Sequence, residues 1–221
     1  MTEITLIRHA QASFGTDDYD RLSPLGHEQS EALGRALARQ GLAPVRLFTG
    51  TQRRHRETLA GLAGPLGLDA EAATVHPGLD EFDFRGLLDA RFQAETPPAG
   101  LHSDRRTHFR TLRDTVLAWQ RDAIDDPPER WADFAARVEA AREALRTAEG
   151  PVLAVSSGGP ISRLIAEVME APTAQMIRLQ LQMKNCAVSR LIAGRTSLHL
   201  HGFNETPHID AATAARLLTY S

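Results

Sequence analysis

This sequence has little cysteine, no surplus of basic charge and no long apolar run. Cys186 is the only cysteine among 221 residues, which excludes an intramolecular disulfide and a cysteine-based zinc cluster. The 25 basic and 28 acidic residues give a formal net charge of -3, so the basic surplus typical of nucleic-acid-binding proteins is missing. No apolar run approaches the roughly 18 residues of a membrane span. We therefore expect neither a nucleic-acid partner nor a membrane.

The N-terminal segment also lacks the pattern of a secretion signal. Its apolar run, Ile4–Ile7, is short and is followed at once by Arg8 and His9. A signal peptide needs basic residues first and a longer apolar stretch after them. This pattern predicts a cytoplasmic protein, whose oligomeric state the sequence leaves open.

The chain does contain enough apolar material for a core, since 42% of its residues are hydrophobic and 24% are charged. Short apolar, β-prone runs alternate with helical patterns along the chain, which is typical of a parallel sheet with crossover helices. We expect one α/β domain over residues 1–221. Its architecture is a three-layer α/β/α sandwich with a mostly parallel central sheet and helices on both faces. The expected strands are Ile4–Ile7, Val45–Phe48, Ala73–His76 and Val152–Val155, and early helices follow Ser23-Pro24 and cover Thr51–Leu62.

The middle and the end of the chain have patterns of their own. Apolar residues at helical spacing over Phe109–Trp119 and Trp131–Leu145 predict two amphipathic helices. Residues from about 84 to 128 are expected to form a helical insertion over the sheet. Two late strands, Ala187–Ile192 and Thr196–His201, are expected to join in a type II′ hairpin at Gly194-Arg195.

Two basic segments follow expected strands, where open α/β sheets bind ligands. Arg8-His9 places a cation beside a nucleophile or base, although a histidine there is more often a structural residue. Arg53 and Arg54, with Arg56 close by, suit phosphate because a guanidinium forms paired hydrogen bonds and keeps its charge. The simpler alternative for these arginines is a solvated helix face.

An acidic segment and a glycine-rich segment are the next candidates. In Asp80-Glu81-Phe82-Asp83, apolar neighbours could desolvate a carboxyl group and make it a general acid, or the acids could simply cap a helix. Ser156-Ser157-Gly158-Gly159-Pro160 joins a strand to a helix expected to begin near Ile161, and amides at a helix N-terminus attract anions. It matches neither a P-loop nor the Gly-x-Ser-x-Gly elbow of hydrolases.

The histidines His199, His201 and His208 allow a metal site in principle. The first two would share one face of a strand, but no carboxylate spacing supports a ligand set. We therefore assign no metal and no cofactor.

Taken in order, these segments resemble the histidine phosphatase superfamily, which includes the cofactor-dependent phosphoglycerate mutases. The resemblance covers nearly the whole chain. Arg8-His9-Ala10 stands for the family's Arg-His-Gly motif after the first strand, and Arg54 precedes Thr58 by the family's four residues. Glu81 matches the family's acid, which follows a leucine with one residue between. The segments that carry the match are Leu6–Gln11, Arg54–Thr58, Leu79–Glu81, Asn185–Val188 and Asn204–His208.

The chain departs from the family pattern at several positions. Ser157 stands where members usually carry a second histidine, so the chain resembles a branch with serine in place of that catalytic residue. Ala10 replaces the glycine of the first motif. The usual threonine and asparagine a few residues later align with Ala12 and Gly15, and Ser13 could partly replace their hydrogen bonds.

The resemblance implies phosphoryl transfer through a phosphohistidine on His9. The neutral ring would attack phosphorus through one nitrogen while the other is held by an acceptor such as a backbone carbonyl. Arg8 and Arg54 would hold the phosphoryl oxygens, with help from Ser157 and from the amides of Gly158 and its neighbour. Glu81 would protonate the leaving oxygen and then deprotonate water. No metal is needed in this scheme.

The sequence therefore predicts a metal-independent phosphatase that acts on a small phosphomonoester or a phosphorylated protein side chain. A phosphate-binding protein of the same fold, with weak or no catalysis, is the alternative, because a serine at 157 brings no positive charge. A phosphoglycerate mutase ranks lower, and a metallohydrolase built on the late histidines is a third class. Replacing Ser157 with histidine is expected to separate an enzyme from a binding protein.

Overall fold

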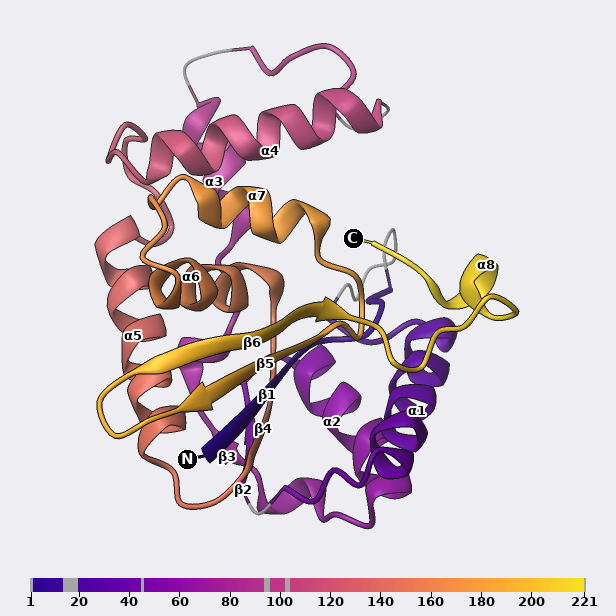
Figure 1. Ribbon diagram of the computed structural model, residues 1–221. Helices are drawn as coiled ribbons and strands as arrows, with labels where there is room; N and C mark the ends of the chain where they lie inside the picture. Colours follow the sequence, from indigo (N-terminus) through magenta and orange to yellow (C-terminus); the bar gives the residue numbers. More distant parts are fainter. Residues whose placement is uncertain (1, 14–19, 45, 94–95, 102–103, 221) are drawn as a thin grey trace.

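The computed structural model of the protein describes residues 2–13, 20–44, 46–93, 96–101 and 104–220. Over these residues six strands form one sheet, in the order β3-β2-β4-β1-β5-β6 (Figure 1). The strands are β1 Thr2–Arg8, β2 Arg46–Thr49, β3 Thr74–Val75, β4 Val152–Ser156, β5 Val188–Ala193 and β6 Leu198–Glu205. Strands β3, β2, β4 and β1 run parallel, whereas β5 is antiparallel to β1 and β6 to β5. The expected α/β sandwich with a mostly parallel sheet is confirmed.

The helices cover both faces of this sheet (Figure 1). Helices α1 and α2 pack with alternate strand residues such as Ile7 and Leu153 in one buried cluster. Helices α5, α6 and α7 pack with the opposite residues, such as Leu6 and Ala154, in a second cluster. The alternation along each strand thus divides the core in two. The helices are α1 Pro24–Arg39, α2 Arg53–Leu66, α3 Phe84–Arg91, α4 Arg105–Trp119, α5 Trp131–Thr147, α6 Gly158–Val168, α7 Gln175–Gln182 and α8 Ala214–Leu217, with 3₁₀ turns at Ala70–Ala72 and Pro77–Leu79.

Local sequence signals account for the helix ends. Ser23 caps α1 by accepting a hydrogen bond of 3.0 Å from the Gly26 amide, and Pro24 takes the first helical position. Helix α2 ends at Gly67, whose backbone is left-handed with φ 65°. The cap at Ser23 sets where α1 begins after β1, and Gly67 sets where α2 ends.

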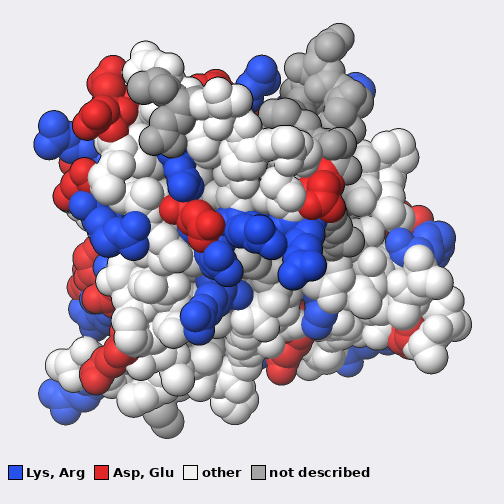
Figure 2. Space-filling model, turned by 90° about the horizontal axis from the view of Figure 1, so that it is seen from above, with Lys and Arg blue, Asp and Glu red and all other residues white. Residues whose placement is uncertain are grey.

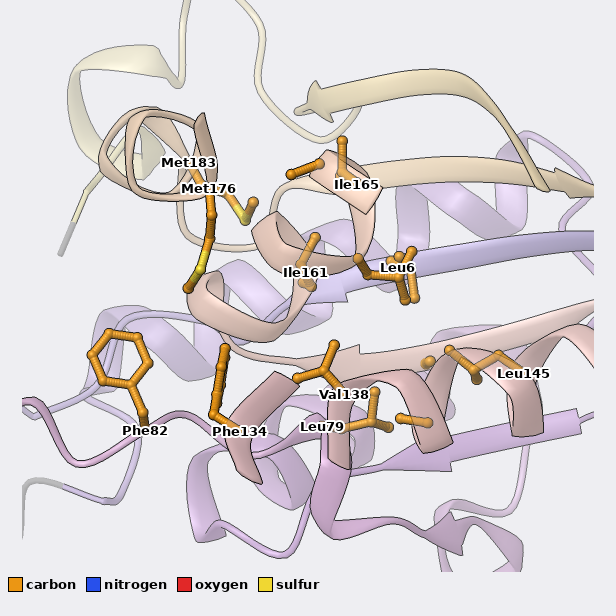
Figure 3. Close-up of a cluster of buried hydrophobic side chains, with 14 of the residues drawn as sticks. Leu6, Leu79, Phe82, Phe134, Val138, Leu145, Ile161, Ile165, Met176 and Met183 are labelled. Atoms are coloured by element: carbon orange, nitrogen blue, oxygen red, sulfur yellow. The ribbon is translucent and has the colours of Figure 1, made fainter. Parts of the chain in front are cut away.

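The larger core cluster contains an aromatic group that anchors the loop before α3. Phe82 packs on Trp119 and Phe134 with ring centroids 5.0 and 5.6 Å apart. In Figure 3, Phe82 and Phe134 lie side by side at one end of the buried cluster that also holds Leu6 and Val138. Because Phe82 is buried in this cluster, the backbone of the preceding residue, Glu81, has little freedom to move.

Several expected boundaries shift in the structure. Strand β2 begins at Arg46, while Val45 lies outside the described residues, and α6 begins at Gly158 rather than near Ile161. The type II′ turn at Gly194-Arg195 is wrong: Gly194 lacks the positive φ that this turn needs. Its amide instead donates to the Ser197 carbonyl at 2.8 Å, so the turn centres one residue later.

Residues 84–128 hold α3 and α4. Helix α4 contacts α3 and α7, and in Figure 1 it lies beyond α7 as seen from the sheet. In the part of the chain that is described, no helix combines the length and the apolar character needed to cross a membrane.

Candidate active site

The carboxyl ends of β1 and β4 bring two sequence segments together. These parallel strands pair Arg8 with Ser156, so the residues that follow each strand emerge side by side. The His9 amide donates to the Ser156 carbonyl at 2.8 Å, and the His9 carbonyl accepts from the Cys186 amide at 3.4 Å. The backbone at His9 is therefore held from both neighbouring strands.

The His9 ring is held in one neutral form. Its Nδ1 lies 2.7 Å from the Ala10 carbonyl, and because a carbonyl only accepts, Nδ1 carries the proton. The lone pair is then on Nε2. Burial lowers the pKa of His9 well below its ordinary value, and the positive charges of Arg54 and Arg8 lower it further. The expected tautomer, held by a backbone carbonyl, is present.

Two buried guanidinium groups flank this imidazole. Arg8 is 7% exposed and donates from Nη1 to the Met183 carbonyl at 2.5 Å. Arg54 is 6% exposed, and its two terminal nitrogens donate to Asp20 at 2.6 Å and to Gln52 at 2.7 Å. Both cations are thus fixed in orientation beside a neutral ring, an arrangement suited to the oxygens of a phosphoryl group.

Glu81 lies at the same edge of the sheet. Its Oε2 accepts from the Gly159 amide at 3.1 Å and from the Gln180 side chain at 3.4 Å. Burial raises the pKa of Glu81 against the opposing influence of the Gly159 hydrogen bond and of the two arginines. A carboxyl group with a raised pKa is suited to donate a proton. A Cβ atom on Gly159 would lie 2.0 Å from Glu81 Oε1, so the glycine leaves the space that the carboxyl group occupies.

Ser157 is fully buried, and its hydroxyl is engaged with a histidine that sequence reasoning missed. Ser157 Oγ lies 2.7 Å from Nε2 of His55, which is also fully buried. On the other side of the ring, Nδ1 lies 3.6 Å from Asp80 Oδ1. The rings of His55 and His9 are 5.6 Å apart between centroids. A second imidazole therefore does occupy this site, delivered by α2 instead of the loop after β4.

Helical spacing could have located His55. It shares the face of α2 that carries Thr58, Leu59 and Leu62, all of them buried. Its flanking arginines suggested a polar segment and concealed this periodicity. The other two arginines of that segment lie on a solvated helix face, the simpler of the two interpretations. Arg53 pairs with Glu57 at the surface, and Arg56 is exposed.

The remaining sequence candidates lie apart from this group or have structural contacts. Asp83 caps α3 through the Gly86 amide, and Asp104 caps α4 through the Thr107 amide. Ser13 donates to the Leu22 carbonyl at 3.0 Å. Gly15, aligned above with a family position, and the side chain of Arg105 lie outside the described residues.

The late histidines do not form a cluster. His199 and His201 are exposed on β6, whereas His208 is largely buried and burial lowers its pKa to about 4. Among the residues that the structure describes, no three His, Cys, Asp or Glu side chains converge as metal ligands. The metallohydrolase hypothesis therefore has no ligand set in this part of the chain.

A buried histidine, two buried arginines and a carboxyl group thus meet at the carboxyl end of an α/β sheet. The family model of the histidine phosphatase superfamily (branch 1) matches residues 4–206, and the chain belongs to this superfamily.

Relatives within the superfamily include mutases and phosphatases. The chain is 28% identical over 185 residues to a 2,3-bisphosphoglycerate-dependent phosphoglycerate mutase of Chelativorans sp. (strain BNC1), covering 79% of this chain and 84% of the relative. Its structure resembles that of a mycobacterial glucosyl-3-phosphoglycerate phosphatase, with a TM-score of 0.64, 25% identity, and 93% of this chain and 100% of the other covered. It also shares the fold of the alpha-ribazole phosphatase from Shigella flexneri, with a TM-score of 0.66, 20% identity, and coverage of 93% and 97%.

Proposed function

We propose that the protein is a metal-independent phosphatase that hydrolyses a phosphomonoester through a phosphohistidine on His9. The observation that carries this proposal is the state of His9. The ring is neutral, its Nδ1 proton is fixed by the Ala10 carbonyl, and its Nε2 lone pair lies beside two buried guanidinium groups.

In the first step, His9 Nε2 attacks phosphorus while the bond to the leaving oxygen breaks. Arg8 and Arg54 hold the nonbridging oxygens and offset their charge. Glu81, whose pKa burial raises, gives its proton to the leaving oxygen. The products of this step are an alcohol and a phosphohistidine.

In the second step, the Glu81 carboxylate takes a proton from a water molecule whose oxygen attacks the phosphohistidine. The bond between phosphorus and Nε2 breaks, inorganic phosphate leaves, and Glu81 is again protonated. One residue serves as acid and then as base, so the site returns to its starting state without a cofactor.

The amide of Gly158 would add a donor to the phosphoryl group. Gly158 opens α6, and a Cβ atom placed on it would lie 3.7 Å from Arg8 Nε. The positive end of a helix of eleven residues therefore lies beside the buried arginine. A neutral serine hydroxyl and this amide are the groups that stand where the family usually has a second histidine.

The substrate class we propose is a small phosphorylated molecule or a phosphorylated protein side chain. Seen from above, Lys and Arg side chains gather near the middle of the molecular surface (Figure 2). Exposed arginines of α4, which include Arg106, Arg110 and Arg113, contribute basic charge to the segment 84–128. We propose that this segment, a helical insertion in a single domain, selects the leaving group.

The test is hydrolysis of p-nitrophenyl phosphate with a chelator present, at mildly acidic to neutral pH, by the wild type and His9→Ala. We expect turnover in the wild type, none in the variant, and a phosphorylated His9 trapped by rapid acid-free quenching. Turnover that persists in His9→Ala would refute the mechanism. Phosphate binding without any turnover, lost in Arg54→Ala, would favour the phosphate-binding alternative, and transfer between phosphoglycerate isomers by a primed enzyme would favour a mutase.

A further inference from the structure

The side chains of Ser157, His55 and Asp80 lie in a row beside the site, joined by one hydrogen bond and one longer contact. Ser157 Oγ lies 2.7 Å from His55 Nε2, and His55 Nδ1 lies 3.6 Å from Asp80 Oδ1. This chain has Ser157 where the family pattern has its second histidine, yet the His55 imidazole reaches Ser157 from α2. This geometry calls for an explanation that packing alone does not give, because a buried imidazole beside the Arg54 guanidinium is costly.

We propose that His55 performs the task of the missing histidine through Ser157. The His55 imidazolium, held by Asp80, donates a hydrogen bond to Ser157 Oγ and so directs the Ser157 hydroxyl proton toward an oxygen of the bound phosphoryl group. Ser157 is then the residue that touches the substrate, and His55 is a positioning residue. The inference rests on the proposed function, which supplies the phosphoryl group.

The direction of the Ser157 hydroxyl follows from the protonation of His55. A carboxylate attracts an N–H group, so Nδ1, which faces Asp80, carries a proton in both states of the ring. In the neutral ring, Nε2 can only accept, and the Ser157 hydroxyl donates to it, away from the substrate. In the charged ring, Nε2 donates, and the hydroxyl proton is released for the phosphoryl oxygen.

The charges around His55 indicate that its ring gains the second proton when the substrate binds. The groups that face the ring are Asp80, Asp20, Arg54 and His9. Burial lowers the pKa of His55 and Arg54 adds to this effect, while the two aspartates oppose it. The empty site therefore favours the neutral ring. A dianionic phosphoryl group favours the charged ring, so one proton moves from solvent to Nε2 when the anion binds.

The structure holds Asp80 in place for this contact. Both of its carboxylate oxygens accept hydrogen bonds of 2.6 Å from Thr51, one from the amide and one from the hydroxyl. A Cβ atom on Gly50 would lie 2.2 Å from His55 Nδ1 and 2.3 Å from Asp80 Oδ1. A glycine at position 50 thus leaves the space in which the two side chains meet.

Serine, histidine and aspartate also form the triad of serine hydrolases, but the surroundings favour the phosphoryl role. An acyl-transfer site needs free backbone amides for the oxyanion. Of the two amides after Ser157, that of Gly159 already donates to Glu81. The His9 ring lies 5.6 Å from that of His55, and a Cβ atom on Gly158 would lie 3.7 Å from Arg8 Nε, so groups suited to a phosphoryl anion lie close by.

The first test is an exchange of the two residues. Ser157→His alone places an imidazole where His55 already lies, so we expect no gain in turnover from this variant. His55→Ala is expected to lower turnover about 10²-fold, the typical effect of removing one charge-stabilising donor. In the double variant His55→Ala, Ser157→His, the imidazole reaches the site from the family position, and we expect turnover within about tenfold of the wild type.

The second test measures proton uptake, which a merely structural role of His55 would not change. Sulfate serves as the probe because it stays fully ionised at neutral pH. Calorimetry in two buffers of different ionisation enthalpy gives the protons taken up per sulfate bound by the wild type and by His55→Gln. Glutamine can keep a neutral hydrogen bond to Ser157, so we expect it to fold and to take up about one proton less.

These measurements separate the inference from the proposed function. Equal proton uptake in the two proteins, or a double variant no better than the single ones, would overturn the relay even if His9 proves essential for turnover. The expected difference in proton uptake, without any turnover in the wild type, would support the relay and refute the phosphatase. Hydrolysis of p-nitrophenyl acetate that Ser157→Ala abolishes would overturn the relay in favour of acyl transfer.

Discussion

A single methyl group on Gly159 should displace the proposed general acid. In Gly159→Ala, the added Cβ would lie 2.0 Å from Glu81 Oε1 and 2.8 Å from the Phe82 ring, both closer than real Cβ contacts allow. Phe82 is held in the aromatic core by Trp119 and Phe134. The carboxyl group, at the free end of its side chain, must therefore move by about 1 Å or more, whereas the packed Phe82 ring has to shift by only a few tenths of an ångström.

The expected loss depends on the leaving group. General acid catalysis contributes roughly 10²–10⁴-fold to rate. For an alkyl phosphate such as glycerol phosphate, whose leaving oxygen needs a proton, we expect kcat/KM to fall by roughly this factor. For p-nitrophenyl phosphate the loss should be far smaller, because nitrophenolate leaves without protonation.

The assay compares kcat/KM for the two substrates in the wild type and in Gly159→Ala. Gly64→Ala is the matched control, since Gly64 also lies in a helix and a Cβ there would meet nothing within 4 Å. Thermal unfolding checks that each variant is folded. An equal loss for both substrates, or no loss, would refute the role assigned to Glu81.

Three further predictions follow from the same contacts. The first step needs Glu81 protonated and His9 neutral. The value of kcat/KM should therefore fall as the pH rises through the raised pKa of Glu81, and on the acid side it should fall only well below pH 6.5, where His9 gains a proton. A pH profile that rises into the alkaline range would contradict this. Arg54→Lys should weaken phosphate binding, measured by calorimetry, roughly 10- to 100-fold, because lysine has no planar guanidinium. It therefore loses the orientation that the hydrogen bonds to Asp20 and Gln52 give and the paired contact with the phosphate oxygens. Unchanged affinity would exclude Arg54 from the site. Gly50→Ala should lower the free energy of unfolding by roughly 1–3 kcal/mol through overpacking, as measured with urea, and an unchanged midpoint would contradict the close approach.

The sequence was most informative where one local pattern decides the structure. The run Ile4–Ile7 predicted β1, and Ser23-Pro24 predicted the start of α1, because burial and capping are local effects. The hairpin turn at Gly194-Arg195 was wrong because a glycine permits a positive φ without requiring one. The order of the strands was not readable, since pairing β5 antiparallel to β1 depends on contacts far apart in sequence.

The candidate site shows the same limit. Matching to a family pattern directed attention to Arg8, His9, Arg54 and Glu81, which the structure places at one edge of the sheet. It could not reveal His55, because this residue has no counterpart in the pattern and becomes a partner of Ser157 only through the packing of α2 against the end of β4.

The lone cysteine makes the protein a reporter of its own unfolding. The Cys186 thiol is fully buried, burial raises its pKa, and its backbone amide donates a hydrogen bond to the His9 carbonyl. A thiol-labelling reagent can react only when this part of the sheet opens, so the labelling rate measures how often it does so. Because Cys186 is the only cysteine, that rate needs no mutagenesis to interpret. Inactivation by a thiol-alkylating reagent would therefore signal loss of structure around His9 and not chemistry at a catalytic thiol.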